Sequence, residues 1–140
     1  MIKGFTTGVF DMFHVGHLRL LKNAKENCDF LRVGVSSDEL VFSYKHKYPV
    51  ISISDRVEIL RSIVYVDDVV IINDRDKKKQ YLDNKYNRLF VGDDWKGSDI
   101  FNDLNNFLSN FGAEIFYFNY TKNISSSKLK SVLESIYEQE

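Results

Sequence analysis

The chain has 140 residues, 44% of them hydrophobic and 28% charged, which predicts one globular domain with no room for a second. Its 19 Lys and Arg residues balance 20 Asp and Glu residues, so the formal net charge is −1. A chain without excess positive charge is a poor nucleic-acid binder, and any anion site must come from a local cluster of cations.

The single cysteine, Cys28, excludes an internal disulfide framework and a zinc site built from several thiolates. The first residues lack a basic segment followed by a long apolar core, and no apolar run reaches the roughly 20 residues that cross a bilayer. The sequence therefore predicts a cytoplasmic protein that does not bind membranes.

The first part of the chain alternates β-rich and amphipathic runs. Residues 2–7 predict a strand, residues 18–27 a helix and residues 30–35 a second strand. The polar stretch over residues 36–50 is interpreted as a loop.

The middle of the chain repeats this alternation. Ser52 and Asp55 have the spacing of a capping box for a helix that ends at residue 63. The apolar residues at 69–72 predict a strand buried on both faces of a parallel sheet. The apolar face of the helix is formed by Ile53, Val57, Leu60 and Val64.

The last part of the chain predicts a polar helix over residues 76–87 and strands over residues 89–91 and 115–118. Between these strands lies a helix that ends at Gly112, with an apolar stripe of Phe101, Leu104, Leu108 and Phe111. A final helix follows the serines at 125–127, with Leu129, Val132, Leu133 and Ile136 on its apolar face.

Five short strands interleaved with helices predict a Rossmann-like α/β fold, which is a doubly wound five-stranded parallel sheet with helices on both faces. No repeat or linker divides the chain, so residues 1–140 are predicted to form a single domain.

The most informative segment is GVFDMFHVGH at positions 8–17, between the first strand and the first helix. Ligands of such sheets bind beyond the carboxyl ends of the strands, where this segment is expected. Gly8 permits a turn directly off the strand, and Gly16 removes a side chain where a phosphate must approach the backbone. His17 falls at the opening of the helix, whose free N–H groups favour an anion.

His14 and His17 can donate hydrogen bonds to phosphate oxygens that gain charge as the phosphorus becomes five-coordinate. Two alternatives remain open, in which one histidine caps the helix or packs in the core, or the pair binds a metal. No third histidine, cysteine or paired carboxylate lies nearby in the sequence to complete a metal site.

The segment resembles the nucleotidylyltransferase family with the HxGH signature, and within it the small cytidylyltransferases, especially the branch that acts on glycerol 3-phosphate. Class I aminoacyl-tRNA synthetases carry a related signature, so HxGH alone is weak evidence. The further matches follow the family's order, and they are VGVSSDE at 33–39, DR at 55–56, YVD at 65–67, GDDW at 92–95 and ISSSK at 124–128.

The resemblance implies that the phosphate of a small phosphorylated alcohol attacks the α-phosphorus of CTP and releases pyrophosphate, with Mg²⁺ carried on the triphosphate and no metal-binding side chain assigned. Glycerol 3-phosphate is the expected alcohol, which gives CDP-glycerol. The alternatives are phosphocholine, phosphoethanolamine or another phospho-alcohol, ATP as the donor, and a weakly catalytic regulatory module that binds nucleotides. The resemblance also implies a homodimer.

Residue by residue, the resemblance assigns catalytic roles at the phosphates to His14, His17, Lys45 and Lys47. It assigns nucleotide binding to Gly8, Val9, Phe10, Gly16, Arg56, Gly92, Asp94, Ile124, Ser125, Ser126 and Ser127. It assigns substrate binding to Asp11, Lys47 and Trp95.

Several of these assignments have a plainer interpretation from the residues alone. YKHKY at 44–48 is a solvated basic loop, and Arg56 is a surface residue paired with an acidic neighbour. Trp95 packs in the core, and the serines at 125–127 cap a helix. Asp11 either shapes its loop through hydrogen bonds or lies near the metal.

The chain departs from the family motif RTxGIST[ST], because Tyr120 stands in place of the arginine that contacts the nucleotide. A phenol cannot reproduce the planar bidentate donor of a guanidinium, although Lys122 places a cation two residues away. This departure bears on nucleotide affinity and, to a lesser degree, on which nucleotide is used.

Overall fold

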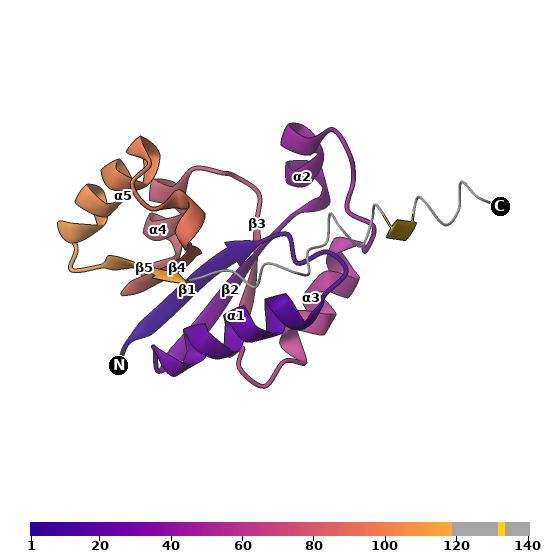
Figure 1. Ribbon diagram of the computed structural model, residues 1–140, viewed down its shortest axis with the longest axis horizontal. Helices are drawn as coiled ribbons and strands as arrows, with labels where there is room; N and C mark the ends of the chain where they lie inside the picture. The colour runs from indigo at the N-terminus through magenta and orange to yellow at the C-terminus, as the bar shows by residue number, and fades with distance from the viewer. Residues whose placement is uncertain (119–131, 134–140) are drawn as a thin grey trace.

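The computed structural model of the chain describes residues 1–118 and 132–133 (Figure 1). A five-stranded parallel sheet has the order β3-β2-β1-β4-β5. This order reverses between β1 and β4, so the carboxyl ends of these strands border the crevice where doubly wound sheets bind ligands. The strands are β1 (Lys3–Gly8), β2 (Phe30–Ser36), β3 (Asp68–Ile72), β4 (Arg88–Gly92) and β5 (Glu114–Phe118).

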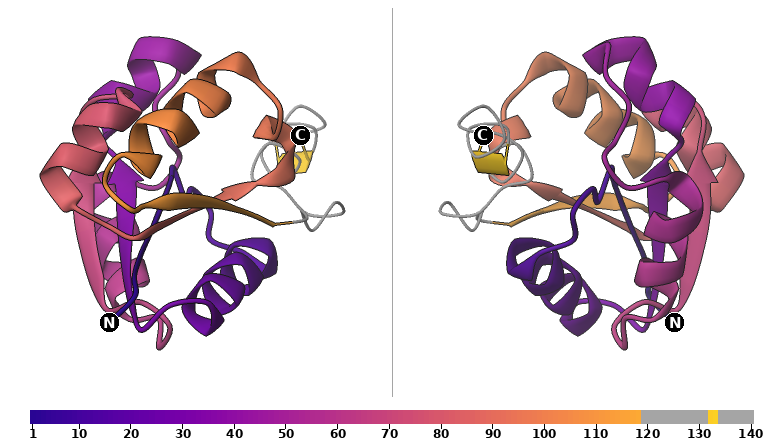
Figure 2. Two further views of the ribbon diagram at one scale, coloured as in Figure 1. Left: turned by 90° about the vertical axis from the view of Figure 1, so that its left-hand side faces the viewer. Right: turned by 90° about the vertical axis from the view of Figure 1, so that its right-hand side faces the viewer.

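Helices lie on both faces of the sheet, which confirms the predicted fold class (Figure 2). Helices α1 (Val15–Glu26) and α3 (Ile53–Arg61) cover one face, and α4 (Lys77–Asn84) and α5 (Asp99–Ser109) cover the other. Two further helical segments directly follow strands at their carboxyl ends, and they are α2 (Asp38–Lys45) after β2 and the 3₁₀ turn η1 (Asp93–Trp95) after β4.

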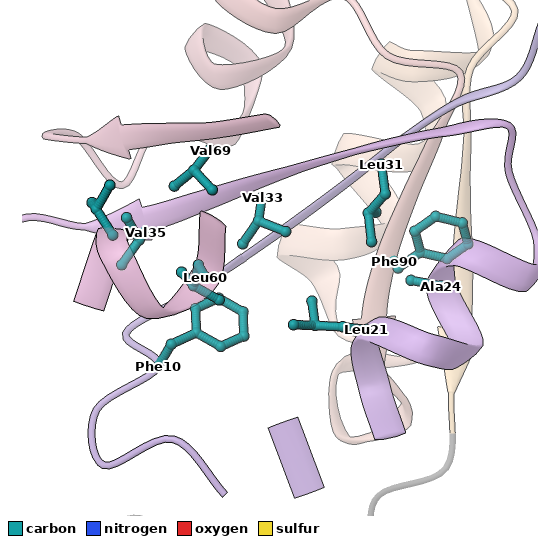
Figure 3. Close-up of a cluster of buried hydrophobic side chains, with 10 residues drawn as sticks. Phe10, Leu21, Ala24, Leu31, Val33, Val35, Leu60, Val69 and Phe90 are labelled. Atoms are coloured by element: carbon teal, nitrogen blue, oxygen red, sulfur yellow. The ribbon is translucent and has the colours of Figure 1, made fainter. Parts of the chain in front are cut away.

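Two apolar clusters hold these helices against the sheet. The first joins α1 and α3 to β2 and includes Leu21, Ala24, Leu31, Val33, Val35 and Leu60 (Figure 3). The second joins α4 and α5 to the opposite face and includes Phe5, Tyr81, Leu89, Phe101, Leu104 and Leu108. Because alternate strand side chains face opposite clusters, a slip of one residue in register would expose both sets.

The prediction of a loop over residues 36–50 is wrong for its first half, which forms α2. Ser37 caps this helix by accepting a hydrogen bond from the N–H of Leu40 at 3.1 Å, and acidic residues in its first turn suit the helix dipole. Only Val41 is buried, so the apolar periodicity was too weak to predict a helix of eight residues.

The capping box predicted at Ser52 and Asp55 is wrong. The Ser52 side chain makes no capping hydrogen bond, and its Oγ lies 3.2 Å from the Oγ of Ser54. Helix α3 ends at Arg61, and Val64 beyond it is 84% exposed, so Val64 does not belong to the apolar face. Val57 and Leu60 are buried as predicted.

Strand β3 was predicted to be buried on both faces, but it is an edge of the sheet and Ile71 is 51% exposed. An apolar run indicates a strand but not its position in the strand order, which depends on crossovers elsewhere in the chain. The bounds predicted for β3, β4 and β5 are confirmed within one residue at each end.

Helix α5 confirms most of the predicted apolar stripe, because Phe101, Leu104 and Leu108 are buried. Phe111 lies beyond the helix and is 50% exposed, and Gly112 has φ +75°, a conformation that favours glycine after a helix. The predicted final helix lies outside the described residues except for residues 132–133, which are helical.

Within the described part of the chain, no helix combines the length and the apolar character needed to cross a membrane.

Candidate active site

The loop at residues 9–14 leaves β1 at the crevice and leads into α1. Phe10 and Met12 have φ values of 53° and 49°, which residues other than glycine rarely adopt. Phe10 is 5% exposed and packs in the first apolar cluster, which holds this strained backbone in place. A Cβ on Gly8 would lie 2.9 Å from the Phe10 ring, so a larger residue at position 8 would displace this ring.

The two histidines of the motif form a capping box at the start of α1. His14 is the N-cap, and its Nδ1 accepts a hydrogen bond from the N–H of Gly16 at 3.0 Å. The N–H of His14 donates in turn to Nδ1 of His17 at 3.2 Å. The helix therefore begins three residues earlier than predicted, and the capping interpretation is confirmed for His14.

Capping leaves the other nitrogen of each ring available for chemistry. Since Nδ1 of each neutral imidazole accepts a hydrogen bond, its proton is on Nε2. The rings stack with their centroids 3.9 Å apart, and Phe10 and Phe13 flank the ring of His17. Among the described residues, Nε2 of His14 is buried and has no hydrogen-bond partner. A buried donor without an acceptor indicates a place for a ligand oxygen.

Both histidines are neutral near neutral pH. Burial lowers the pKa of His14. The pKa of His17 is lowered to about 4, mainly by burial and further by the adjacent His14, against the opposing charge of Asp11. Neutral rings with a proton on Nε2 can donate hydrogen bonds to phosphate oxygens without taking up a proton.

The low pKa of His17 predicts that folding stability decreases in mild acid. Below pH 6.5 the unfolded chain protonates this residue, but the folded chain does not until about pH 4. The titration of His17 therefore does not affect the free energy of unfolding above pH 6.5, and it lowers this free energy increasingly as the pH falls toward 4. Urea denaturation at both ends of this window measures it, and His17→Gln, which preserves a capping-box acceptor, is expected to lose less stability than wild type. Equal losses of stability in the two proteins would contradict the lowered pKa of His17.

Lys77 lies at the same crevice and was missed from the sequence. Its Nζ donates to Oγ1 of Thr7 in β1 at 2.9 Å. Burial, together with the positive charge of Arg75, lowers its pKa to about 8. The run KKK at 77–79 gave no signal that its first lysine turns inward, because the polar pattern of α4 is typical of a solvated helix.

The predicted catalytic lysines lie at the end of α2 and just after it, rather than together on a loop. Lys45 is the last residue of α2, and its Nζ lies 5.9 Å from the centroid of the Tyr44 ring. Lys47 is exposed just after the left-handed C-cap of the helix, His46. Arg75 stacks on the same tyrosine at 4.3 Å, which brings a cation from the β3–α4 connection to α2.

Arg56 is 1% exposed, so its interpretation as a surface residue paired with an acidic neighbour is wrong. Its Nη1 donates to the carbonyls of Val9 at 2.8 Å and Ser36 at 2.7 Å. Its Nε donates to the carbonyl of Ile51 at 2.9 Å, and its Nη2 pairs with Asp38 at 2.5 Å. Arg56 therefore ties together the carboxyl ends of β1 and β2, which frame the site.

The GDDW segment leaves the carboxyl end of β4 through η1. Trp95 is 48% exposed and stacks on Phe101 with the ring centroids 5.4 Å apart, so its interpretation as a core residue is wrong. Asp94 is exposed beside it, and Gly92 is buried at the strand end. The position of this segment suits a contact with a base or an alcohol.

The remaining predicted site residues cannot be placed on this geometry. Tyr120, Lys122 and the ISSSK segment with Ile124, Ser125, Ser126 and Ser127 lie outside the described residues, and their roles stay predictions. Within residues 1–118 and 132–133, no group of three or more His, Cys, Asp or Glu side chains could hold a metal ion.

Comparison with known proteins adds evidence from outside the geometry. A family model described as cytidylyltransferase-like matches residues 5–132. The glycerol-3-phosphate cytidylyltransferase of Bacillus subtilis (strain 168) is 35% identical over 138 residues, which are 97% of this chain and 100% of that protein. The FAD synthase of Pyrococcus abyssi is 55% identical over 64 residues, which are 46% of this chain and 43% of that protein.

Among solved structures, the chain is similar to the lipopolysaccharide core biosynthesis protein from Thermoplasma volcanium GSS1. The TM-score is 0.72 and the sequence identity 26%, and the match covers 89% of this chain and 99% of that one.

Proposed function

The chain belongs to the cytidylyltransferase-like family of enzymes, and we propose that it transfers a cytidylyl group from CTP to the phosphate of glycerol 3-phosphate. The products are CDP-glycerol and pyrophosphate. The observation that carries this proposal is the pair of histidines at the carboxyl end of β1, both of which keep Nε2–H for a ligand. The full-length similarity to the glycerol-3-phosphate cytidylyltransferase favours this acceptor.

In the proposed reaction, an oxygen of the acceptor phosphate forms a bond to the α-phosphorus, and the bond from that phosphorus to the bridging oxygen of pyrophosphate breaks. The Nε2–H groups of His14 and His17 donate to phosphate oxygens as their negative charge grows. Neither ring exchanges a proton or forms a covalent bond. Lys45, Lys47 and Lys77 supply the positive charge that the net charge of −1 does not.

We propose that Mg²⁺ is held by the triphosphate oxygens and water, where it neutralises part of the charge. The carboxylate closest to the histidines in the motif is that of Asp11, which accepts hydrogen bonds from the N–H groups of Val50 and Ile51. These bonds favour the loop-shaping interpretation of Asp11 over a role near the metal.

A second candidate uses ATP as the donor. It is favoured by the identity to the FAD synthase, which is higher than that to the glycerol-3-phosphate cytidylyltransferase but extends over only 46% of this chain. Tyr120, in place of the family's arginine, also bears on nucleotide choice.

Pyrophosphate release tests the proposal. CTP, ATP, GTP and UTP are each combined with glycerol 3-phosphate, phosphocholine or phosphoethanolamine in the presence of Mg²⁺, with acceptor-free reactions as the control for hydrolysis. We expect turnover only with CTP and glycerol 3-phosphate. Turnover with another acceptor would reject glycerol 3-phosphate as the substrate, and turnover with ATP would favour the second candidate. Turnover with no pair would reject the proposed reaction and leave an acceptor outside this set or a regulatory nucleotide-binding module.

A further inference from the structure

We infer that Asp11 is a positioning residue that fixes the lysine segment, defined as residues 45–51, against the histidine loop at residues 9–14. This inference rests on the proposed function, because it concerns how the lysines reach the triphosphate. It assigns to Asp11 an action through Lys45 and Lys47 rather than contact with a substrate.

The geometry begins with the Asp11 carboxylate, which is 2% exposed. Its Oδ2 accepts the N–H of Val50 at 2.8 Å, and its Oδ1 accepts the N–H of Ile51 at 2.9 Å. These donors lie 39 and 40 residues away along the chain. Two charge-assisted hydrogen bonds from one buried carboxylate set both the distance and the orientation of the segment that they hold.

Arg56 holds the same segment from its other side. Its Nε donates to the carbonyl of Ile51 at 2.9 Å, while its Nη1 donates to the carbonyl of Val9 at 2.8 Å. The N–H and the C=O of Ile51 are thus bound by oppositely charged buried side chains. Both connections lead back to the histidine loop, through Asp11 and through Val9.

The start of α2 is fixed to the same centre, because Asp38 pairs with Nη2 of Arg56 and also accepts the N–H of Ile53 at 3.3 Å. Lys45 ends this helix of eight residues, and Lys47 lies three residues before Val50. Three residues span at most about 11 Å, so Lys47 cannot move far from the held backbone. The two lysines are therefore placed between two anchored ends.

These contacts hold the lysine segment, which supplies positive charge, at a fixed position relative to the histidine loop, which supplies hydrogen-bond donors. Asp11 lies three residues before His14, whose Nδ1 caps α1. A shift of the segment relative to the histidines by about 1 Å is enough to reduce turnover by around 10²-fold. This positioning role explains why a carboxylate is buried at this point.

Asp11→Asn tests the inference, because the amide has nearly the same shape but only one acceptor oxygen, and its NH₂ group faces the second backbone N–H. We expect amide hydrogen exchange at Val50 and Ile51 to accelerate by about tenfold or more, while the amides of β2 keep their protection. Unchanged exchange at both positions would overturn the inference. This readout does not depend on turnover, so it remains decisive even if the proposed function fails.

A double-mutant cycle with Lys47→Ala gives the second readout. In wild type, Lys47→Ala is expected to raise the KM for CTP by about tenfold, whereas in the Asp11→Asn background it should raise KM by about twofold or less. Asp55→Asn, at an exposed carboxylate in the first turn of α3, is the matched control and should combine multiplicatively with Lys47→Ala. If Lys47→Ala raised the KM for CTP by the same factor in the Asp11→Asn background as in wild type, Asp11 would have a merely structural role and the inference would be overturned.

If Asp11→Asn does not fold, Asp11→Glu replaces it in both experiments. This variant keeps the charge and both acceptor oxygens but displaces the held backbone by one methylene group. The same coupling with Lys47→Ala is expected, and its absence overturns the inference.

Discussion

Replacement of His14 by asparagine is expected to lower turnover by a factor of about 10² or more without unfolding α1. Asparagine is a preferred N-cap residue, so it can replace the hydrogen bond that Nδ1 accepts from the N–H of Gly16. It has no donor at the position of Nε2, the buried atom that lacks a partner among the described residues. The variant therefore separates the structural role of this histidine from its chemical role.

His17→Gln applies the same logic to the second ring, because glutamine at the third helical position can still accept the N-cap N–H. A comparable loss of turnover is expected, together with circular dichroism and a urea midpoint at pH 7 close to those of wild type. Pyrophosphate release under saturating substrates measures the loss. Full activity in either variant would show that the histidines only cap the helix.

Arg56→Ala is expected to reduce the free energy of unfolding by about 3 kcal/mol. The substitution leaves the carbonyls of Val9, Ser36 and Ile51 without their donor and the Asp38 carboxylate without its cation. Asp38 keeps 25% of its side chain exposed, which places the effect at the lower end of the range for broken buried pairs.

Arg61→Ala on the same helix is the control, since Arg61 is exposed and its removal should change stability by less than about 0.5 kcal/mol. Urea denaturation followed by circular dichroism compares the two variants. An Arg56→Ala protein as stable as Arg61→Ala would contradict the role of Arg56 in joining the strand ends.

The alternation of β-rich and amphipathic runs was sufficient to predict the five strands, the four helices that cover the sheet and the location of the histidine motif at the end of β1. The strand order was not readable, and for that reason β3 was assigned a buried position although Ile71 lies on an edge. Helix α2 was missed because a short polar helix depends on its cap and on a single buried valine, Val41, rather than on periodicity.

The site was predicted from side-chain chemistry, and its errors have a common physical origin. A sequence gives the type of a side chain but not the direction in which it points. One of two interpretations placed Arg56 on the surface, but it is buried, and one of two placed Trp95 in the core, but it is half exposed. Nothing in the polar pattern of residues 76–87 indicated that Lys77 bonds to β1. The capping box predicted at Ser52 for α3 does not form, whereas α1 has one built from the two histidines, a residue type for which the sequence pattern of a capping box gives no signal.

Mass spectrometry of the products from CTP, glycerol 3-phosphate and Mg²⁺ tests cytidylyl transfer most directly. We expect CDP-glycerol and pyrophosphate in equal amounts with the wild-type enzyme, and both lower by about 10²-fold or more with His14→Asn after the same reaction time. Pyrophosphate accompanied by CMP instead of CDP-glycerol, or equal product from both proteins, would contradict this expectation.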